Sequence, residues 1–154
     1  MGRTLLPPWI APAPAQIGTS KTGKLSADQW RTTATVHLVT TLVRLWGANQ
    51  SNSRRYRMLT NFMDLVTATK LATMRTMSTS RIDLYNLHMR RYLKNYLELY
   101  QDVGLTPNQH LSLHFGEVLH NFGPTHGWRS WVFERMNYKL QEVSTNKKFG
   151  ELVS

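Results

Sequence analysis

Apolar side chains that recur every three or four residues along the middle of the chain limit its fold more than any other feature. The clearest run consists of Ile82, Tyr85, Met89, Tyr92, Tyr96, Leu99 and Val103. This spacing follows one face of an α-helix, and no run of useful length alternates with the period of a β-strand. The 154 residues are enough for one hydrophobic core. We therefore expect an all-α domain.

Start and stop signals divide the chain into about five helices, which we expect to form an irregular bundle. The expected helices cover residues 26–46, 53–74, 80–103, 106–121 and 130–144. Ser26 with Gln29 has the spacing of a capping box, and Thr106 with Gln109 gives a second start signal. For the third helix, which we expect to begin at Ser80, Asp83 is the expected capping residue. On the second helix, the inward side chains are expected at Leu59, Phe62, Met63, Val66 and Leu71.

The first 24 residues differ in composition from the rest of the chain. They contain four of the six prolines, and proline disfavours a regular helix because its φ is fixed and its N–H is missing. We expect an extended proline-rich arm over 1–24, a helical domain over 25–145 and a polar tail over 146–154. The arm reads as a spacer, with a ligand for a polyproline-binding module as the alternative.

The excess of positive charge is the main guide to a partner. The 19 lysines and arginines exceed the nine acidic residues by 10, which favours a polyanion such as nucleic acid. From residue 54 to residue 91, eight cations face only Asp64 and Asp83, a local charge of +6. We predict that these cations bind phosphates, with a solvated basic face as the alternative: Arg54, Arg55, Arg57, Lys70, Arg75, Arg81, Arg90 and Arg91.

Three of these arginines stand where helix electrostatics disfavour them. Arg54, Arg55 and Arg57 fall in the first turn of the second expected helix, at the positive end of its dipole. An anionic partner would explain their position.

Several classes of protein are excluded or left without a motif. The chain has no cysteine, which removes disulfides and thiolate zinc sites and suits an intracellular protein. No apolar run is long enough to span a membrane, and Pro7 and Pro8 interrupt any secretory signal. No Walker loop, GxGxxG, GxSxG or HExxH pattern occurs. We expect an intracellular, nuclear protein with no membrane partner.

Two side-chain constellations allow alternative interpretations. His110, His114 and Glu117 have the spacing of one helix face and could bind zinc or iron; an ordinary surface histidine pair is the preferred interpretation, so we predict no metal site in the isolated chain. The tyrosines of the third expected helix could stack on bases, but their near-heptad spacing favours core packing.

The carboxy-terminal third carries a recognisable pattern. FGPTHGWRSWVFERMNYKLQ (122–141) follows NQHLSLH (108–114) and precedes TNKKFGEL (145–152), while PWIAPAP (8–14) and GKLSADQW (23–30) lie upstream. This arrangement resembles the uncharacterised domain that follows the transposase core in CACTA-type (En/Spm-like) transposons and in related fungal transposon proteins. The resemblance covers nearly the whole chain.

The resemblance implies a role for two residues in catalysis by a larger protein. In DDE-type transposases, three carboxylates hold two divalent metal ions during strand cleavage and transfer. Glu134, in Phe-Glu-Arg, would be the third acid, and His114 matches the upstream histidine of the family. An ordinary exposed or ion-paired glutamate is the alternative for Glu134. This chain lacks the ribonuclease-H-like core and its aspartate pair, so we expect no enzymatic activity and no cofactor for the chain alone, and Mg²⁺ only for a complete transposase.

The sequence therefore supports two functional hypotheses. The first is a transposon-derived, transposase-associated helical domain that binds DNA non-specifically through its second and third helices. The second is a helical protein–protein interaction module, without nucleic-acid binding, that packs on the missing transposase core or on a like subunit.

Overall fold

The computed structural model describes residues 27–128, and this part of the chain confirms the all-α expectation. The elements are α1 (Ala27–Thr32), a π-helical segment η2 (Thr33–His37), α2 (Leu38–Trp46), α3 (Arg54–Ala72), α4 (Thr79–Leu99), α5 (Pro107–Ser112), α6 (Phe115–Phe122) and a 3₁₀ turn η3 (Thr125–Gly127). The expected arm, the expected last helix over 130–144 and the polar tail lie outside the described residues.

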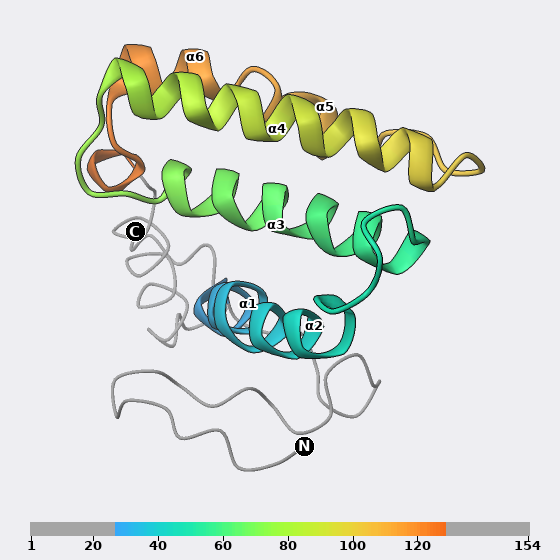
Figure 1. Ribbon diagram of the computed structural model, residues 1–154. Helices are drawn as coiled ribbons and strands as arrows, with labels where there is room; N and C mark the ends of the chain where they lie inside the picture. Colours follow the sequence, from blue (N-terminus) through green and yellow to red (C-terminus); the bar gives the residue numbers. More distant parts are fainter. Residues whose placement is uncertain (1–26, 129–154) are drawn as a thin grey trace, which may run out of the picture.

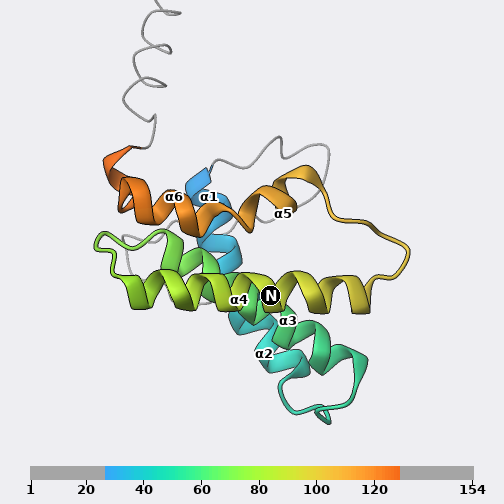
Figure 2. The same cartoon turned by 90° about the horizontal axis from the view of Figure 1, so that it is seen from above.

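The described helices stack in three layers (Figure 1). α1, η2 and α2 form the lowest layer, α3 the middle one, and α4 with α5 and α6 the uppermost. Seen from above, α5 and α6 lie beside α4 (Figure 2). α3 therefore packs against neighbours on two sides, which explains why a helix of such mixed polarity is buried along most of its length.

The core lies mainly between α3, α4 and α6. Ala68, in the last third of α3, is fully buried, and its small side chain lets α4 approach closely. The cluster of buried residues comprises Ala68, Leu71, Ala72, Ile82, Tyr85, Met89, Leu93 and Leu119. The sequence periodicity predicted Leu71, Ile82, Tyr85 and Met89 as inward residues, and these are confirmed.

Tyr85 joins α4 to α5 through its hydroxyl. Tyr85 is only 2% exposed, and its O–H donates to the Ser112 carbonyl oxygen at 2.7 Å. Burial raises the pKa of Tyr85 to about 12. The hydroxyl therefore stays protonated and keeps this donor role even at an alkaline pH at which an exposed tyrosine begins to ionise.

Two predicted boundaries of the third helix are wrong. α4 begins after Ser78, whose side chain accepts from the Arg81 N–H, so Ser78 is the cap, and Asp83 is an exposed residue inside the helix. At the other end α4 stops at Leu99, because Tyr100 leaves helical geometry (φ −127°, ψ 70°). Val103 thus lies outside the helix and is 47% exposed.

The single helix expected over 106–121 is divided in two. Its start is confirmed, because Thr106 and Gln109 form a complete capping box with Pro107 at the first position. At Leu113 and His114 the backbone N–H groups bond to carbonyls three residues earlier, a tighter turn that separates α5 from α6.

α6 lies close to α4 because Gly116 has no side chain. A Cβ placed on Gly116 would be 2.1 Å from Oδ1 of Asn86. The absence of a side chain at Gly116 therefore allows α6 to pack closely on α4, although glycine has a low helix propensity.

We predict that Gly116→Ala destabilises the fold by about 1 kcal/mol, because the clash outweighs the gain in helix propensity. Urea denaturation measures the change. In an Asn86→Ala background the clash is absent, so the same substitution is expected to become neutral or stabilising. Equal effects in both backgrounds would contradict this packing.

Candidate nucleic-acid interface

Three cations share the outer face of α4. Arg90, Arg91 and Lys94 are exposed. They lie within about 100° of one another around the helix axis, outside the face that carries the buried Ile82 and Met89. Neither Arg90 nor Lys94 forms an ion pair with another described residue. Lys94 was not among the predicted cations, although its position four residues after Arg90 places it on the same face.

The acidic residues of α4 stand near its ends. Asp83 is the fifth residue of the helix and Glu98 the last but one, so neither lies between Arg90 and Lys94 along the helix. The three cations therefore form a compact positive group over about one and a half helical turns, with the exposed Glu98 one turn beyond Lys94.

Arg91 of α4 is bonded to a buried carboxylate on α3. Its Nε–H donates to Oδ2 of Asp64 at 2.8 Å, and its Nη2 donates to Oδ1. The Asp64 side chain is only 2% exposed, whereas half of the Arg91 side chain remains exposed. The bonds to Asp64 raise the pKa of Arg91 above its usual value. From the sequence, Asp64 was counted only as one of two negative charges within the basic region. In the structure it is bonded to Arg91, one of the cations of that region.

His88 completes the network around Asp64. Its Nδ1 lies 2.9 Å from Oδ1 of Asp64, and its side chain is 21% exposed. Asp64 therefore accepts from two side chains of α4, which is the arrangement that a buried carboxylate needs to remain charged.

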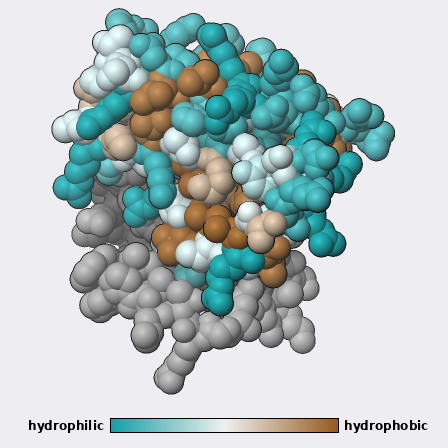
Figure 3. Space-filling view, viewed as in Figure 1, coloured by the Kyte–Doolittle hydropathy of each residue, from teal (hydrophilic) through white to brown (hydrophobic). Residues whose placement is uncertain are grey.

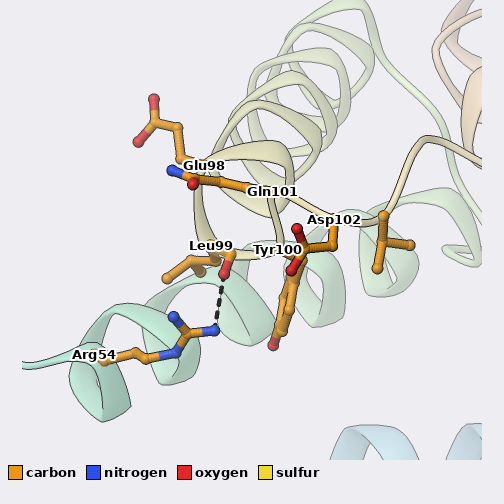
Figure 4. A pocket seen from close by; sticks show the side chains of 7 residues that line it. Arg54, Glu98, Leu99, Tyr100, Gln101 and Asp102 are labelled. Carbon is orange, nitrogen blue, oxygen red and sulfur yellow. Dashed lines mark hydrogen bonds between the residues drawn. The ribbon is translucent and has the colours of Figure 1, made fainter.

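The arginines in the first turn of α3 have an internal explanation. Arg54 donates from Nη2 to the Leu99 carbonyl oxygen at 2.9 Å (Figure 4), and Arg57 lies 3.3 Å from Oε2 of Glu98. Because α4 runs back over α3, the start of α3 lies beside the end of α4. These cations thus meet the negative end of the α4 dipole, which explains the positions of Arg54 and Arg57 within the fold itself. Their predicted binding of phosphates stays a prediction.

The remaining predicted cations do not join the outer face of α4. Arg55 and Lys70 are exposed, and they lie on the side of α3 opposite the residues that face α4. Arg75 is exposed in the α3–α4 connection, and Arg81 donates to the Thr76 carbonyl oxygen at 2.7 Å. The two ends of α3 are about 28 Å apart, since it has 19 residues. The eight predicted cations therefore form separate groups, not one surface.

An open cavity of about 270 Å³ lies where α4 ends (Figure 4). Arg54, Glu98, Tyr100 and Asp102 contribute to its lining. The two carboxylates outnumber the single arginine, which is already bonded to Leu99. This cavity lacks the excess of positive charge that a phosphate would require.

The possible metal ligands His110, His114 and Glu117 lie on the surface. The rings of His110 and His114 are 5.4 Å apart, and Nδ1 of His114 lies 4.0 Å from Oε1 of Glu117, but all three residues are exposed. Among the described residues, no group of three or more His, Asp or Glu side chains could hold a metal ion. Glu134 lies outside the described residues, so its predicted role with His114 stays a prediction.

The tyrosines pack on one another. The ring centroids are 6.0 Å apart for Tyr92 and Tyr96 and 5.0 Å apart for Tyr96 and Tyr100. Tyr92 also packs against the core cluster. All three are half-buried, which fits the expected packing role better than open platforms for bases.

Hydrophobic side chains also reach the surface. Figure 3 shows them as patches within a mainly hydrophilic face. On α4, Leu84 is 45% and Leu87 is 55% exposed, on the outer face that also carries the cations. Within residues 27–128, no helix combines the length and the apolar character needed to cross a membrane.

Comparison with known proteins gives no match. No protein-family model, no curated protein and no solved structure shows significant similarity to this chain.

We predict that Arg91→Ala destabilises the fold by about 3 kcal/mol, because it leaves Asp64 buried with His88 alone. Urea denaturation of the variant measures this loss. The double variant with Asp64→Ala is expected to be more stable than Arg91→Ala itself, since no unpaired carboxylate remains. Additive losses would show that the two side chains act independently.

Proposed function

We propose that this chain is a helical DNA-binding domain that contacts the phosphate backbone through the outer face of α4. The observation that carries the proposal is the position of Arg90, Arg91 and Lys94 on one exposed face with no acidic residue among them. Such a surface attracts a polyanion without reading base sequence. The total charge of +10 supports the same partner by long-range attraction.

The proposal includes the context that the sequence resemblance implies. In this view the domain belongs to a transposon-derived protein of the DDE type, acts there beside a separate catalytic core, and has no catalytic activity alone. Glu134 would supply one carboxylate to the metal site of a complete transposase. The sequence of the transcript upstream of residue 1 tests this part: two aspartates on predicted strands would support it, and a message that begins at Met1 would contradict it.

We predict that binding to a short DNA duplex weakens as salt rises, with a slope of log K against log salt between about −1.8 and about −2.7. The smaller value counts Arg90 and Lys94 alone, and the larger value adds a full contribution from Arg91, whose charge Asp64 partly offsets. Fluorescence anisotropy across a salt series measures the slope. The variant Arg90→Ala/Lys94→Ala is expected to bind about tenfold more weakly at low salt and to lose about two units of slope.

The matched control removes two charges from another face. Arg55→Ala/Lys70→Ala lowers the net charge equally, but both positions lie on the side of α3 away from α4. If the two double variants bind equally, general charge and not the face of α4 determines binding. A wild-type affinity that does not change with salt would refute phosphate contact altogether.

The exposed leucines support a second candidate function. Leu84 and Leu87 lie beside the cations on α4, and exposed apolar groups within a polar surface are common at protein interfaces. A helical interaction module would form a concentration-dependent complex with a like subunit or a missing core. Sedimentation of the purified chain distinguishes the candidates, because self-association that duplex DNA does not alter favours this one.

A further inference from the structure

One of the three cations on α4 is held differently from the other two. Arg91 donates two N–H groups to Asp64, from Nε and from Nη2. A guanidinium has five N–H donors in one plane, so three remain, and the half-exposed side chain gives them access to solvent. For Arg90 and Lys94, no bond to a described residue fixes a direction.

Asp64 itself is held firmly enough to orient a partner. Its side chain is 2% exposed, it lies in the middle of α3, and Nδ1 of His88 meets the same oxygen that Nη2 of Arg91 contacts. The charged or titratable groups on this carboxylate are therefore Arg91 and His88, both from α4. A carboxylate held in this way fixes the plane of the Arg91 guanidinium that is bonded to it.

We infer that Asp64 is a positioning residue for DNA binding: it directs the free edge of the Arg91 guanidinium outward, toward a backbone phosphate. The inference rests on the proposed function and assigns different roles to the three cations. Arg90 and Lys94 supply mobile charge, whereas Arg91 supplies hydrogen bonds in a fixed direction. A donor that is already ordered loses less conformational entropy when it binds.

The charge balance predicts how Arg91 differs in experiment. Asp64 offsets the positive charge of Arg91, so Arg91 releases fewer counterions than an unpaired cation does. Its contribution lies in geometry, which lysine cannot reproduce, because one ammonium group lacks the planar fork that reaches a carboxylate and a phosphate together.

The test is Arg91→Lys, which keeps the charge and removes the fork. Anisotropy with the same duplex is expected to show about tenfold weaker binding than wild type, a loss at least threefold greater than that of Arg90→Lys. The salt slope is expected to remain close to that of wild type. Arg55→Lys, a change on the opposite side of α3, serves as the control for an Arg-to-Lys exchange. Equal losses for Arg91→Lys and Arg90→Lys would overturn the inference.

A measurement on the wild-type protein covers the case in which Arg91→Lys does not fold, which circular dichroism reveals. The arginine Nε–H resonances are followed by ¹⁵N NMR while the duplex is added. The Arg91 resonance is expected to be protected from exchange, because it donates to buried Asp64, and to shift on binding. No shift at saturating DNA would overturn the inference.

These outcomes separate the inference from the function on which it rests. The proposed function is contradicted if duplex binding does not depend on salt, or if the two double variants bind equally well. If binding is salt-dependent and requires α4, but Arg91→Lys weakens it no more than Arg90→Lys does, only the positioning role of Asp64 is contradicted.

Discussion

The buried carboxylate of Asp64 is the constraint around which the packing of α3 on α4 is arranged. A charge taken out of water is costly unless it is paired and hydrogen-bonded, and both partners, His88 and Arg91, come from α4. A shift of α4 by one turn would separate them from Asp64. The polar contact therefore fixes the register of two helices that hydrophobic burial alone would hold with less specificity.

The same two helices explain why so many cations serve the fold. Because α4 runs back over α3, its carbonyl-rich end lies beside the first turn of α3. Arg54 bonds to the Leu99 carbonyl oxygen there, and Arg57 pairs with Glu98. Cations that oppose the dipole of their own helix thus complement the dipole of the next one. A count of charges along the sequence cannot separate these residues from cations that face an external partner.

Local patterns predicted much of the fold and less of the candidate site. The helical period identified Ile82, Tyr85 and Met89 as core residues, and Thr106 with Gln109 identified a helix start, because both signals depend on neighbours within one or two turns. The start of α4 was misplaced because Ser78 and Ser80 are both acceptable caps by sequence. The bond from Arg54 to Leu99 spans 45 residues, and no local pattern predicts it.

The arginines fall into two groups by their contacts, with one exception. Arg54 and Arg57 form bonds where the start of α3 meets the end of α4, whereas Arg90 is exposed and forms no ion pair with another described residue. Arg91 belongs to both groups, since one edge of its guanidinium holds Asp64 and the other is exposed. At this position a single planar side chain connects the packing of the two helices with the surface of α4. Among the basic side chains, only arginine has the geometry for both contacts. If DNA binding requires arginine at Arg91 but only a positive charge at Arg90 and Lys94, the contact with phosphate depends on the geometry of the side chain. A helix that binds by positive charge alone would show no such difference.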